Sequence, residues 1–194
     1  MENAKKLSLT FRVDNGVIEH NNRTFKAKNV DADRTSDNII YKSENLREKY
    51  HELFDAALEE YNSRKRSNEK ILDYYEHIKN GKQEKPFYEA VIQFGDTESC
   101  GLKSGNWEIA KEMLDEYMLS FEERNKNIKV FNAVLHLDEA TPHFHIDFVP
   151  ICTNQTRGLS TRVSLKRALA EQGIVASSHK KSEWRFGRTL SLSR

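Results

Sequence analysis

Three of the seven histidines in this sequence fall within the ten residues 136–145, beside two carboxylates and a proline. The preceding residues, 130–135, are mostly apolar and partly β-branched, and apolar residues alternate with polar ones after Pro142. This pattern predicts a strand, a turn and a second strand, with Pro142 at the start of the second strand, where a missing N–H is tolerated. The chain should therefore contain an antiparallel strand pair at this point.

Side chains alternate along a strand, so His143 and His145 should point to the same face of this hairpin. If either of them lies opposite His136, three imidazoles share that face, with directly opposed Cβ atoms roughly 5 Å apart. Three convergent imidazoles suit a divalent metal ion. From these residues alone, separate surface histidines and a zinc hydrolase site remain alternatives. The opposite face takes the apolar residues Phe144, Ile146 and Phe148.

The composition is that of a polar globular protein. The chain has 194 residues, of which 31% are charged and 37% hydrophobic, enough for one domain with a sizeable core. No apolar run approaches the ~20 residues of a membrane span, and the N-terminus lacks the apolar region of a signal peptide, so we expect a cytoplasmic location. Cys100 and Cys152 lack metal-type spacing and are expected to be free thiols, with a disulfide as the alternative.

The formal net charge of +1 conceals an uneven distribution. Residues 1–40 contain 7 basic and 6 acidic groups (+1), residues 41–151 contain 15 and 22 (−7), and residues 152–194 contain 9 and 2 (+7). A polyanion would therefore meet a basic C-terminal segment, although a solvated basic tail explains the charge equally well.

Hydrophobic periodicity assigns the remaining elements. Alternation predicts strands over residues 7–13 and 88–94, and residues 29–38 should form an ordered loop. His20 should lie in a loop or short strand. Apolar residues at helical spacing predict helices over residues 44–64, 68–79, 107–124 and 162–172.

These elements predict an α+β fold in which helices pack on one face of an antiparallel sheet. Asn106 is expected to cap the third helix, whose apolar stripe should cover Phe144, Ile146 and Phe148. We expect one catalytic domain over residues 1–173 and a basic tail over 174–194.

Two motifs carry a resemblance to a known family. His-Asn-x-Arg at residues 20–23 and His-x-Asp-Glu-x-Thr-Pro-His-x-His at residues 136–145 together resemble the MobV (Pre/Mob) plasmid mobilisation relaxases of the HUH endonuclease class. The resemblance covers roughly residues 7–173. It extends to Asn29-x-Asp31-x-x-Arg34-Thr35-x-x-Asn38 and to a later segment around Gly158-Leu159-Ser160 with its flanking arginines.

The resemblance implies a relaxase-like fold and an enzyme that nicks one DNA strand at a plasmid transfer origin, remaining joined to the 5′ phosphate. It makes His20 the nucleophile and Glu139 a candidate proton acceptor. Most HUH enzymes use a tyrosine, so Tyr41 is the alternative nucleophile. The matching metal ligands are His136, His143 and His145. The residues that would bind DNA or support the site are Arg23, Asn29, Asp31, Arg34, Asn38, Arg157 and Arg162.

The implied cofactor is Mn²⁺ or Mg²⁺, with Zn²⁺ as another option, and the implied partner is single-stranded or supercoiled plasmid DNA. Neutral imidazole ligands leave positions on such an ion open for phosphate oxygens. The competing hypotheses are a DNA-binding or replication protein of the same fold that does not cleave, and a zinc hydrolase. Family members usually continue into a helix-rich region linked to self-association. Residues 174–194 are alternatively the start of such a region, and neither dimerisation nor membrane association is carried over.

Overall fold

The computed structural model describes residues 9–14, 16–25 and 27–174. The strands in this part of the chain are β1 (Leu9–Asp14), β2 (Ile39–Ser43), β3 (Tyr88–Phe94), β4 (Ile128–His136), β5 (His143–Cys152) and β6 (Arg162–Val163). The α-helices are α1 (Ile18–Asn21), α2 (Leu46–Ser63), α3 (Tyr74–Lys79), α4 (Thr97–Cys100), α5 (Trp107–Leu119), α6 (Phe121–Arg124) and α7 (Leu165–Glu171). Two short 3₁₀ helices are η1 (Ala32–Asp37) and η2 (Ser67–Glu69). The expected tail over 174–194 lies outside the described residues except for residue 174.

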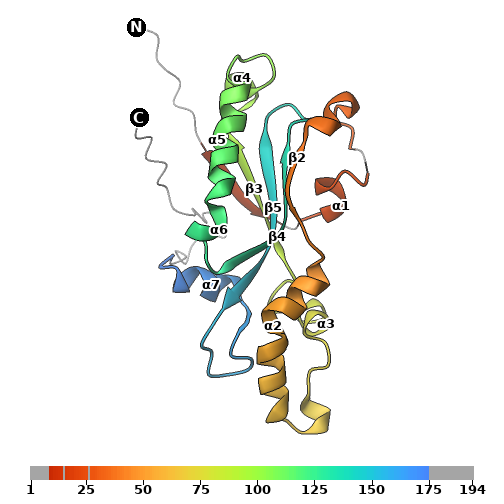
Figure 1. The fold of residues 1–194 in the computed structure, drawn as a ribbon, viewed down its shortest axis with the longest axis vertical. Coiled ribbons are helices and arrows are strands. Elements are labelled where there is room, and N and C mark those ends of the chain that lie inside the picture. The colour runs from red at the N-terminus through yellow and green to blue at the C-terminus, as the bar shows by residue number, and fades with distance from the viewer. Residues whose placement is uncertain (1–8, 15, 26, 175–194) are drawn as a thin grey trace.

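The strands form an antiparallel sheet in the order β1-β3-β5-β4-β2, and β6 pairs with the end of β5 (Figure 1). The predicted hairpin is its centre, because β4 and β5 pair along almost their whole length and His136 lies directly opposite His143. The α+β class and the antiparallel sheet predicted from the sequence are confirmed.

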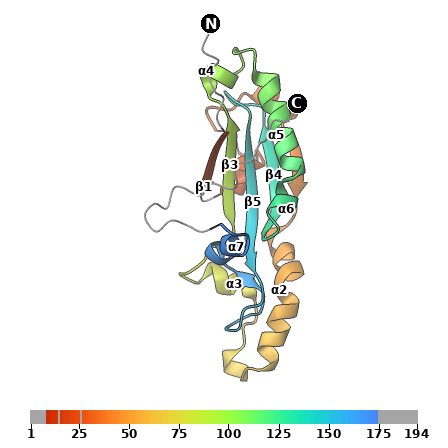
Figure 2. The ribbon, with the colours of Figure 1, turned by 90° about the vertical axis from the view of Figure 1, so that its left-hand side faces the viewer.

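One face of the sheet, called here the core face, carries the main hydrophobic core. Phe144, Ile146 and Phe148 are fully buried there. Figure 2 shows α5 and α6 running along one side of the sheet. Their buried residues Ala110, Leu114, Tyr117, Met118 and Phe121 belong to the same cluster as the three strand residues. The predicted cover of the apolar strand positions is therefore confirmed.

The opposite face, called here the histidine face, has two parts. Near the β4–β5 turn it carries the three histidines, and at its far end Phe131 and Val149 form a second hydrophobic cluster with α2 and α3. Figure 1 shows α2 and α3 at the end of the sheet away from this turn. Tyr74 belongs to this second cluster and is 7% exposed, as expected for a packing residue. The helices close one end of this face.

Several predicted helices begin or end differently in the structure. The helix predicted over 68–79 is η2 followed by an extended stretch and α3, because the Asn62 side chain pairs with the backbone N–H and C=O of Ile71. Asp73 then caps α3 by accepting from the backbone N–H of Glu76. The helix predicted over 162–172 begins only at Leu165, because β6 first pairs with β5.

Three other local predictions were wrong. The helix predicted over 107–124 is interrupted at Ser120, and Asn106 does not cap α5 with its side chain, which donates instead to the carbonyl oxygen of Ser99. His20 lies in the short helix α1 rather than in a loop or strand. Strand β2 follows η1 without having been predicted, and a register shift between Ile40 and Lys42 interrupts its pairing with β4.

Cys100 and Cys152 are free thiols, as predicted, and both are buried. No helix within the described ranges has the length and apolar character needed to cross a membrane.

We expect Phe144→Ala to lower the free energy of unfolding by about 3–5 kcal/mol, because it leaves a cavity in the fully buried core face. Urea unfolding monitored by circular dichroism measures the change. Leu119→Ala is the control, since Leu119 is 77% exposed and its truncation should cost less than about 0.5 kcal/mol. Equal losses for both variants would contradict the assignment of the core.

Candidate metal centre

The structure brings the three predicted ligands together on the histidine face. The ring centroids of His136 and His143 are 5.3 Å apart, those of His136 and His145 are 4.6 Å apart, and those of His143 and His145 are 5.1 Å apart. All three residues are buried, His136 completely. The alternative of separate surface histidines is therefore wrong.

Each of these histidines uses one ring nitrogen to hold its orientation. Carbonyl and carboxylate oxygens only accept hydrogen bonds, so the nitrogen facing such an oxygen carries the proton and the other nitrogen keeps its lone pair. Metal-binding histidines commonly have an acceptor of this kind behind them. The donor and acceptor pairs are His136 Nε2 with the Asn21 carbonyl oxygen (2.8 Å), His143 Nδ1 with the Thr141 carbonyl oxygen (2.9 Å) and His145 Nδ1 with Glu89 Oε1 (2.6 Å).

The ring nitrogens that do not face these acceptors are available to a ligand. His136 Nδ1 is buried and has no hydrogen-bond partner among the described residues, a costly state for a nitrogen lone pair unless a ligand meets it. Burial, and secondarily the neighbouring histidines, lower the pKa of His136 to about 2 and that of His145 to about 3. Both rings are therefore neutral at physiological pH, as ligation of a cation requires.

Two overlapping sets of side chains have potential ligand atoms within 4.8 Å of one another. One contains His20, His136 and His145, and the other contains His136, Glu139 and His143. His136 is common to both sets, but neither set contains all three of the predicted ligands. The N-terminal histidine predicted as a nucleophile is thus placed directly beside the predicted ligands.

His20 and Glu139 face each other across this site. His20 Nε2 lies 3.7 Å from Glu139 Oε1 and 3.3 Å from Arg23 Nη1. A guanidinium only donates, so this contact leaves the proton of a neutral His20 ring on Nδ1 and the lone pair on Nε2. The same Glu139 oxygen lies 3.9 Å from His136 Nδ1 and 3.9 Å from His143 Nε2. One carboxylate oxygen therefore contributes negative charge close to three imidazoles.

Arg23 joins the N-terminal segment to the β4–β5 turn. It donates to both carboxylate oxygens of Asp138, at 2.9 Å and 2.6 Å, and to Glu139 Oε1 at 2.8 Å. The Asp138 side chain is fully buried. Burial acts to raise its pKa, but the hydrogen bonds from Arg23 and Asn38 prevail and lower the pKa of Asp138 to about 2. Arg23 has a left-handed backbone (φ 56°), a conformation that costs a non-glycine residue roughly 1–2 kcal/mol and that these bonds offset.

The other residues of the second motif also contact this turn. Arg34 donates to the carbonyl oxygens of Leu137 (2.5 Å) and Glu139 (3.1 Å) and pairs with Asp31. The remaining contacts run from Asn29 Nδ2 to Glu139 Oε2 (2.6 Å), from the Asp31 N–H to the Asp138 carbonyl oxygen (2.8 Å), from Asn38 Nδ2 to Asp138 Oδ2 (2.9 Å) and from the Leu137 N–H to Asn38 Oδ1 (2.7 Å). These contacts favour a supporting role for the motif over a role in DNA binding.

A polar cluster beneath the histidines was not identified from the sequence. Asn21 donates to Glu89 (2.7 Å) and to Asp147 (2.9 Å), and Asn132 donates to the same Asp147 oxygen (2.8 Å). Burial raises the pKa of Asp147 to about 6, against the lowering effect of these two amides. Strand alternation offered a signal, because Asp147 lies two residues after His145 and therefore on the same face.

One tyrosine and two arginines among the predicted site residues lie away from the histidine site. The Tyr41 ring packs against Phe144 with its hydroxyl donating to Asp115, so it lies on the core face, which contradicts its role as alternative nucleophile. Arg157 and Arg162 follow the far end of β5 and do not support the histidine site, contrary to that option in the prediction. A contribution of these two arginines to DNA binding stays a prediction.

Together, the fold and site define an α+β protein with a candidate three-histidine metal centre on the central hairpin of an antiparallel sheet. A family model of Mob_Pre, described as plasmid recombination enzyme, matches residues 15–183. The chain therefore belongs to the Mob_Pre family of plasmid recombination enzymes, and the resemblance inferred from the motifs is confirmed.

The chain is also similar to solved structures of the MobM relaxase domain bound to oriT DNA of plasmid pMV158 and to Mn. The structure at pH 5.5 is 16% identical, with 88% of this chain and 90% of that chain covered and a TM-score of 0.40. The structure at pH 4.6 is 17% identical, with 89% and 90% covered and a TM-score of 0.42. A search of curated proteins gives no match.

We expect Asp138→Asn to lower the free energy of unfolding by about 1.5–3 kcal/mol at pH 7, because Arg23 then loses its fully buried charged partner and keeps only Glu139. Chemical unfolding in the presence of a chelator measures this loss without a contribution from metal binding. Glu60→Gln is the matched control, since the exposed Arg64–Glu60 pair should be worth less than about 1 kcal/mol. Similar losses for both variants would contradict the anchoring role of the Arg23–Asp138 pair.

We expect Asp147→Asn to stabilise the metal-free protein at pH 7.5 by roughly 1–3 kcal/mol. A carboxylate whose pKa rises to about 6 on folding, from about 3.9 when unfolded, makes the wild type less stable as pH increases from 4 to 6. The asparagine removes this loss, and its amide also offers a donor to the unpartnered Asn21 and Asn132 oxygens. Urea unfolding should show the advantage shrink as pH falls through 6 towards 4.

The control for this measurement is Asp37→Asn, whose side chain is exposed and should produce no such pH dependence. An Asp147→Asn variant that is less stable than the wild type at pH 7.5, or whose difference from it is independent of pH, would be inconsistent with a buried carboxyl of raised pKa.

Proposed function

We propose that this protein is a relaxase that nicks one DNA strand at a plasmid transfer origin and becomes joined to the new 5′ phosphate through His20. The observation that carries the proposal is the position of His20, which shares a set of potential ligand atoms with His136 and His145 and whose Nε2 lies 3.7 Å from Glu139 Oε1. Membership of a family of plasmid recombination enzymes supports DNA as the substrate. The proposed partner is a single-stranded segment of supercoiled plasmid DNA.

The proposed ligands are His136 through Nδ1 and His143 and His145 through Nε2, the nitrogens left unprotonated by the acceptors behind the rings. Three imidazole ligands bind Mn²⁺, Mg²⁺ and Zn²⁺ with different affinities, and the supply of each ion in the cell contributes to which one is bound. When bound, such an ion polarises a phosphate and stabilises the charge of the transition state. The orphaned Nδ1 of His136 supports this ligand set.

The proposed reaction is a transesterification in which the Nε2 atom of His20 attacks phosphorus. An N–P bond forms and the P–O3′ bond breaks. The leaving oxygen takes up a proton and becomes a 3′-hydroxyl, while the imidazole releases its Nδ1 proton, so that atoms and charge balance. The phosphoramidate keeps the phosphate activated, so that a later attack by a 3′-hydroxyl rejoins the strand. Hydrolysis would discard this possibility.

Glu139 and Arg23 prepare His20 for this step. Glu139 Oε1 lies 3.7 Å from His20 Nε2, so it would take the proton that a doubly protonated ring must lose from this nitrogen before attack. Its charge also stabilises the positive charge that develops on the imidazole during attack, whereas the Nδ1 proton leaves from the other side of the ring. Arg23 donates to Glu139 Oε1 and places a second guanidinium nitrogen 3.3 Å from His20 Nε2, so it holds both groups in position. Asn29 holds the second oxygen of the same carboxylate. The carboxylate and the nucleophile are thus oriented before DNA arrives.

We expect His20→Ala to abolish nicking while retaining Mn²⁺ binding, and His143→Ala to lower both, since only the second variant removes a proposed ligand. Nicking is measured by conversion of supercoiled plasmid carrying a candidate transfer origin to open circles, and Mn²⁺ by isothermal titration calorimetry. His51→Ala is the control, because His51 is exposed on α2 and pairs with Asp55.

The two variants also separate nucleophile from ligand. If His20→Ala loses Mn²⁺ binding as fully as His143→Ala does, His20 belongs to the ligand set and the nucleophile must be sought elsewhere. Undiminished nicking by His20→Ala would exclude it from both roles. Retention of origin DNA by the wild type without any nicking would instead favour the DNA-binding protein of the same fold.

A further inference from the structure

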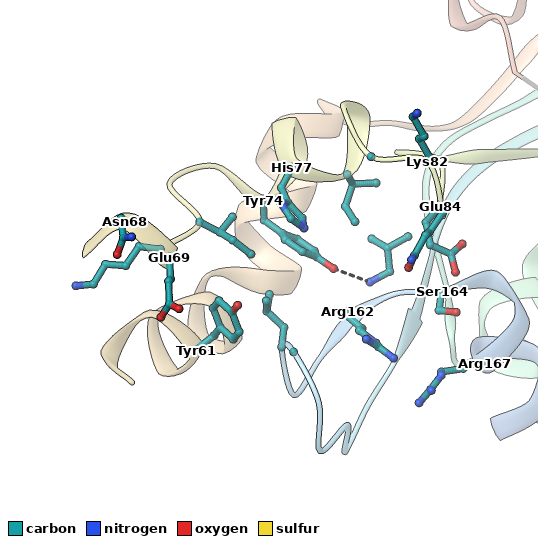
Figure 3. A pocket seen from close by; sticks show the side chains of 18 residues that line it. Tyr61, Asn68, Glu69, Tyr74, His77, Lys82, Glu84, Arg162, Ser164 and Arg167 are labelled. Atoms are coloured by element: carbon teal, nitrogen blue, oxygen red, sulfur yellow. Dashed lines mark hydrogen bonds between the residues drawn. The ribbon is translucent and has the colours of Figure 1, made fainter. Parts of the chain in front are cut away.

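A pocket of about 860 Å³ lies at the end of the molecule away from the histidines. One side is formed by α2, η2 and α3, and the other by the segment from the β5–β6 connection to α7 (Figure 3). The lining includes the aromatic rings of Tyr61, Tyr74 and His77. No residue here takes part in the proposed reaction.

Four cationic side chains line this pocket. They are Lys70, Lys82, Arg162 and Arg167. Within the described residues none of them forms an ion pair with a carboxylate, whereas Arg23, Arg34 and Arg47 each do. Figure 3 shows Arg162 and Arg167 on one side of the pocket and Lys82 across from them. Cations without acidic partners, gathered around one concavity, favour an anionic ligand.

Two details strengthen this reading of the lining. Two carboxylates, Glu69 and Glu84, also line the pocket. Glu84 accepts hydrogen bonds from the Tyr88 hydroxyl (3.0 Å) and the Leu165 N–H (3.4 Å), so it serves the fold rather than the cations. Arg162 has a buried Nε without a hydrogen-bond partner among the described residues, although its Nη1 reaches the Arg157 carbonyl oxygen. An unpaired buried donor is costly and is commonly matched by a ligand.

The aromatic lining adds a second type of contact. The rings of Tyr74 and His77 are nearly parallel, with an interplanar angle of 17° and centroids 6.0 Å apart. His77 is exposed, so the stack extends from the buried tyrosine to the pocket rim. Rings beside lysine and arginine side chains are the combination that binds single-stranded nucleic acid, whose bases stack while cations contact phosphates.

The pocket lies at the far end of β5, beyond the part of the histidine face that α2 and α3 cover. His145 and Ile151 lie six positions apart on β5 and point to the same face by alternation, and Ile151 pairs with Val163 of the lining. At about 3.3 Å per residue, the path from the histidines to the pocket is about 20 Å. A stacked single strand rises about 3.4 Å per nucleotide, so roughly six nucleotides would span it.

We propose that this pocket is a second anchoring site for the DNA strand, binding the phosphates and a base of a segment about six nucleotides from the scissile phosphate. The inference rests on the proposed function for the identity of its ligand. Lys82 and Arg167 contact the phosphates, with Arg167 exchanging its hydrogen bond to the Gln155 side-chain oxygen for one to phosphate. The exposed ring of His77, backed by the buried ring of Tyr74, offers a stacking surface. The site adds affinity and holds the strand at the far end of the sheet, after it has passed the helices α2 and α3 that cover the histidine face there.

The test is the binding of fluorescein-labelled dT24 to the full chain in Mn²⁺ buffer, followed by fluorescence anisotropy at several salt concentrations. Lys82→Gln with Arg167→Gln should weaken binding by about three- to tenfold. It should also reduce the slope of log K against log salt by about 1.4, since each lost single-strand phosphate contact removes about 0.7. Lys111→Gln with Lys126→Gln is the matched control, because it removes two positive charges from α5 and the connection between α6 and β4.

Equal losses of dT24 affinity in the two double variants would overturn the proposal, because the loss would then follow from the lower net charge and not from this pocket. Unchanged binding by Lys82→Gln with Arg167→Gln would overturn it as well. Plasmid nicking by the unaltered protein is measured separately. If the unaltered protein does not nick plasmid but Lys82→Gln with Arg167→Gln weakens dT24 binding more than the control does, the proposed reaction is wrong and the anchoring site stands. If the unaltered protein nicks plasmid and the two double variants bind dT24 equally well, the anchoring site is wrong and the proposed reaction stands.

Discussion

The buried pair between Arg23 and Asp138 is the interaction on which the candidate site depends. Residue 23 follows a short helix near the N-terminus, and residue 138 lies in the turn between the two central strands. Their bidentate contact brings together segments 115 positions apart in sequence. Because both side chains are shielded from water, either one left alone would be strongly destabilising. The position of His20 beside the ligands follows from this pair.

The central hairpin provides the other constraint. Alternation along β5 directs Phe144 and Ile146 into the core beneath α5 and directs His143 and His145 to the opposite face. Because Phe144 and Ile146 are anchored by packing, the imidazoles between them cannot exchange faces. The acceptors behind each ring then fix its rotation and its proton. A rigid sheet and fixed proton positions together leave unprotonated nitrogens on three neighbouring imidazoles, in a site where Glu139 and His20 complete the two sets of potential ligand atoms.

The sequence predicted the hairpin, the shared face of the histidines and the helix over the apolar strand positions, because all three depend on local periodicity. It also predicted that Arg23, Asn29 and Arg34 belong with the histidines, through their motifs rather than through spacing. It could not predict which side chain each would contact, since Asp138 lies more than 100 residues away. The hydrogen bonds from Asn21 to Glu89 and Asp147 are likewise long-range contacts, which hydrophobic periodicity cannot predict.

Residues outside the motifs show the same limit. Tyr41 follows the second motif closely, but β2 directs its ring to the core face, so proximity in sequence misplaced it. Arg157 and Arg162 resembled a later motif, yet β5 carries the chain to the far end of the sheet before they occur. The face to which a strand directs a side chain determines the position of Tyr41, and the course of β5 determines the positions of Arg157 and Arg162. Spacing along the sequence gives neither.

The most direct test of the account is to identify the residue that carries DNA after nicking. The protein would be incubated with Mn²⁺ and supercoiled plasmid carrying a candidate origin, denatured, and digested with nuclease and protease at alkaline pH, where a phosphoramidate survives. Mass spectrometry should then locate the nucleotide on the peptide that contains His20. A nucleotide on a tyrosine or on any other residue, or nicked circles without attached protein, would contradict the role assigned to this histidine.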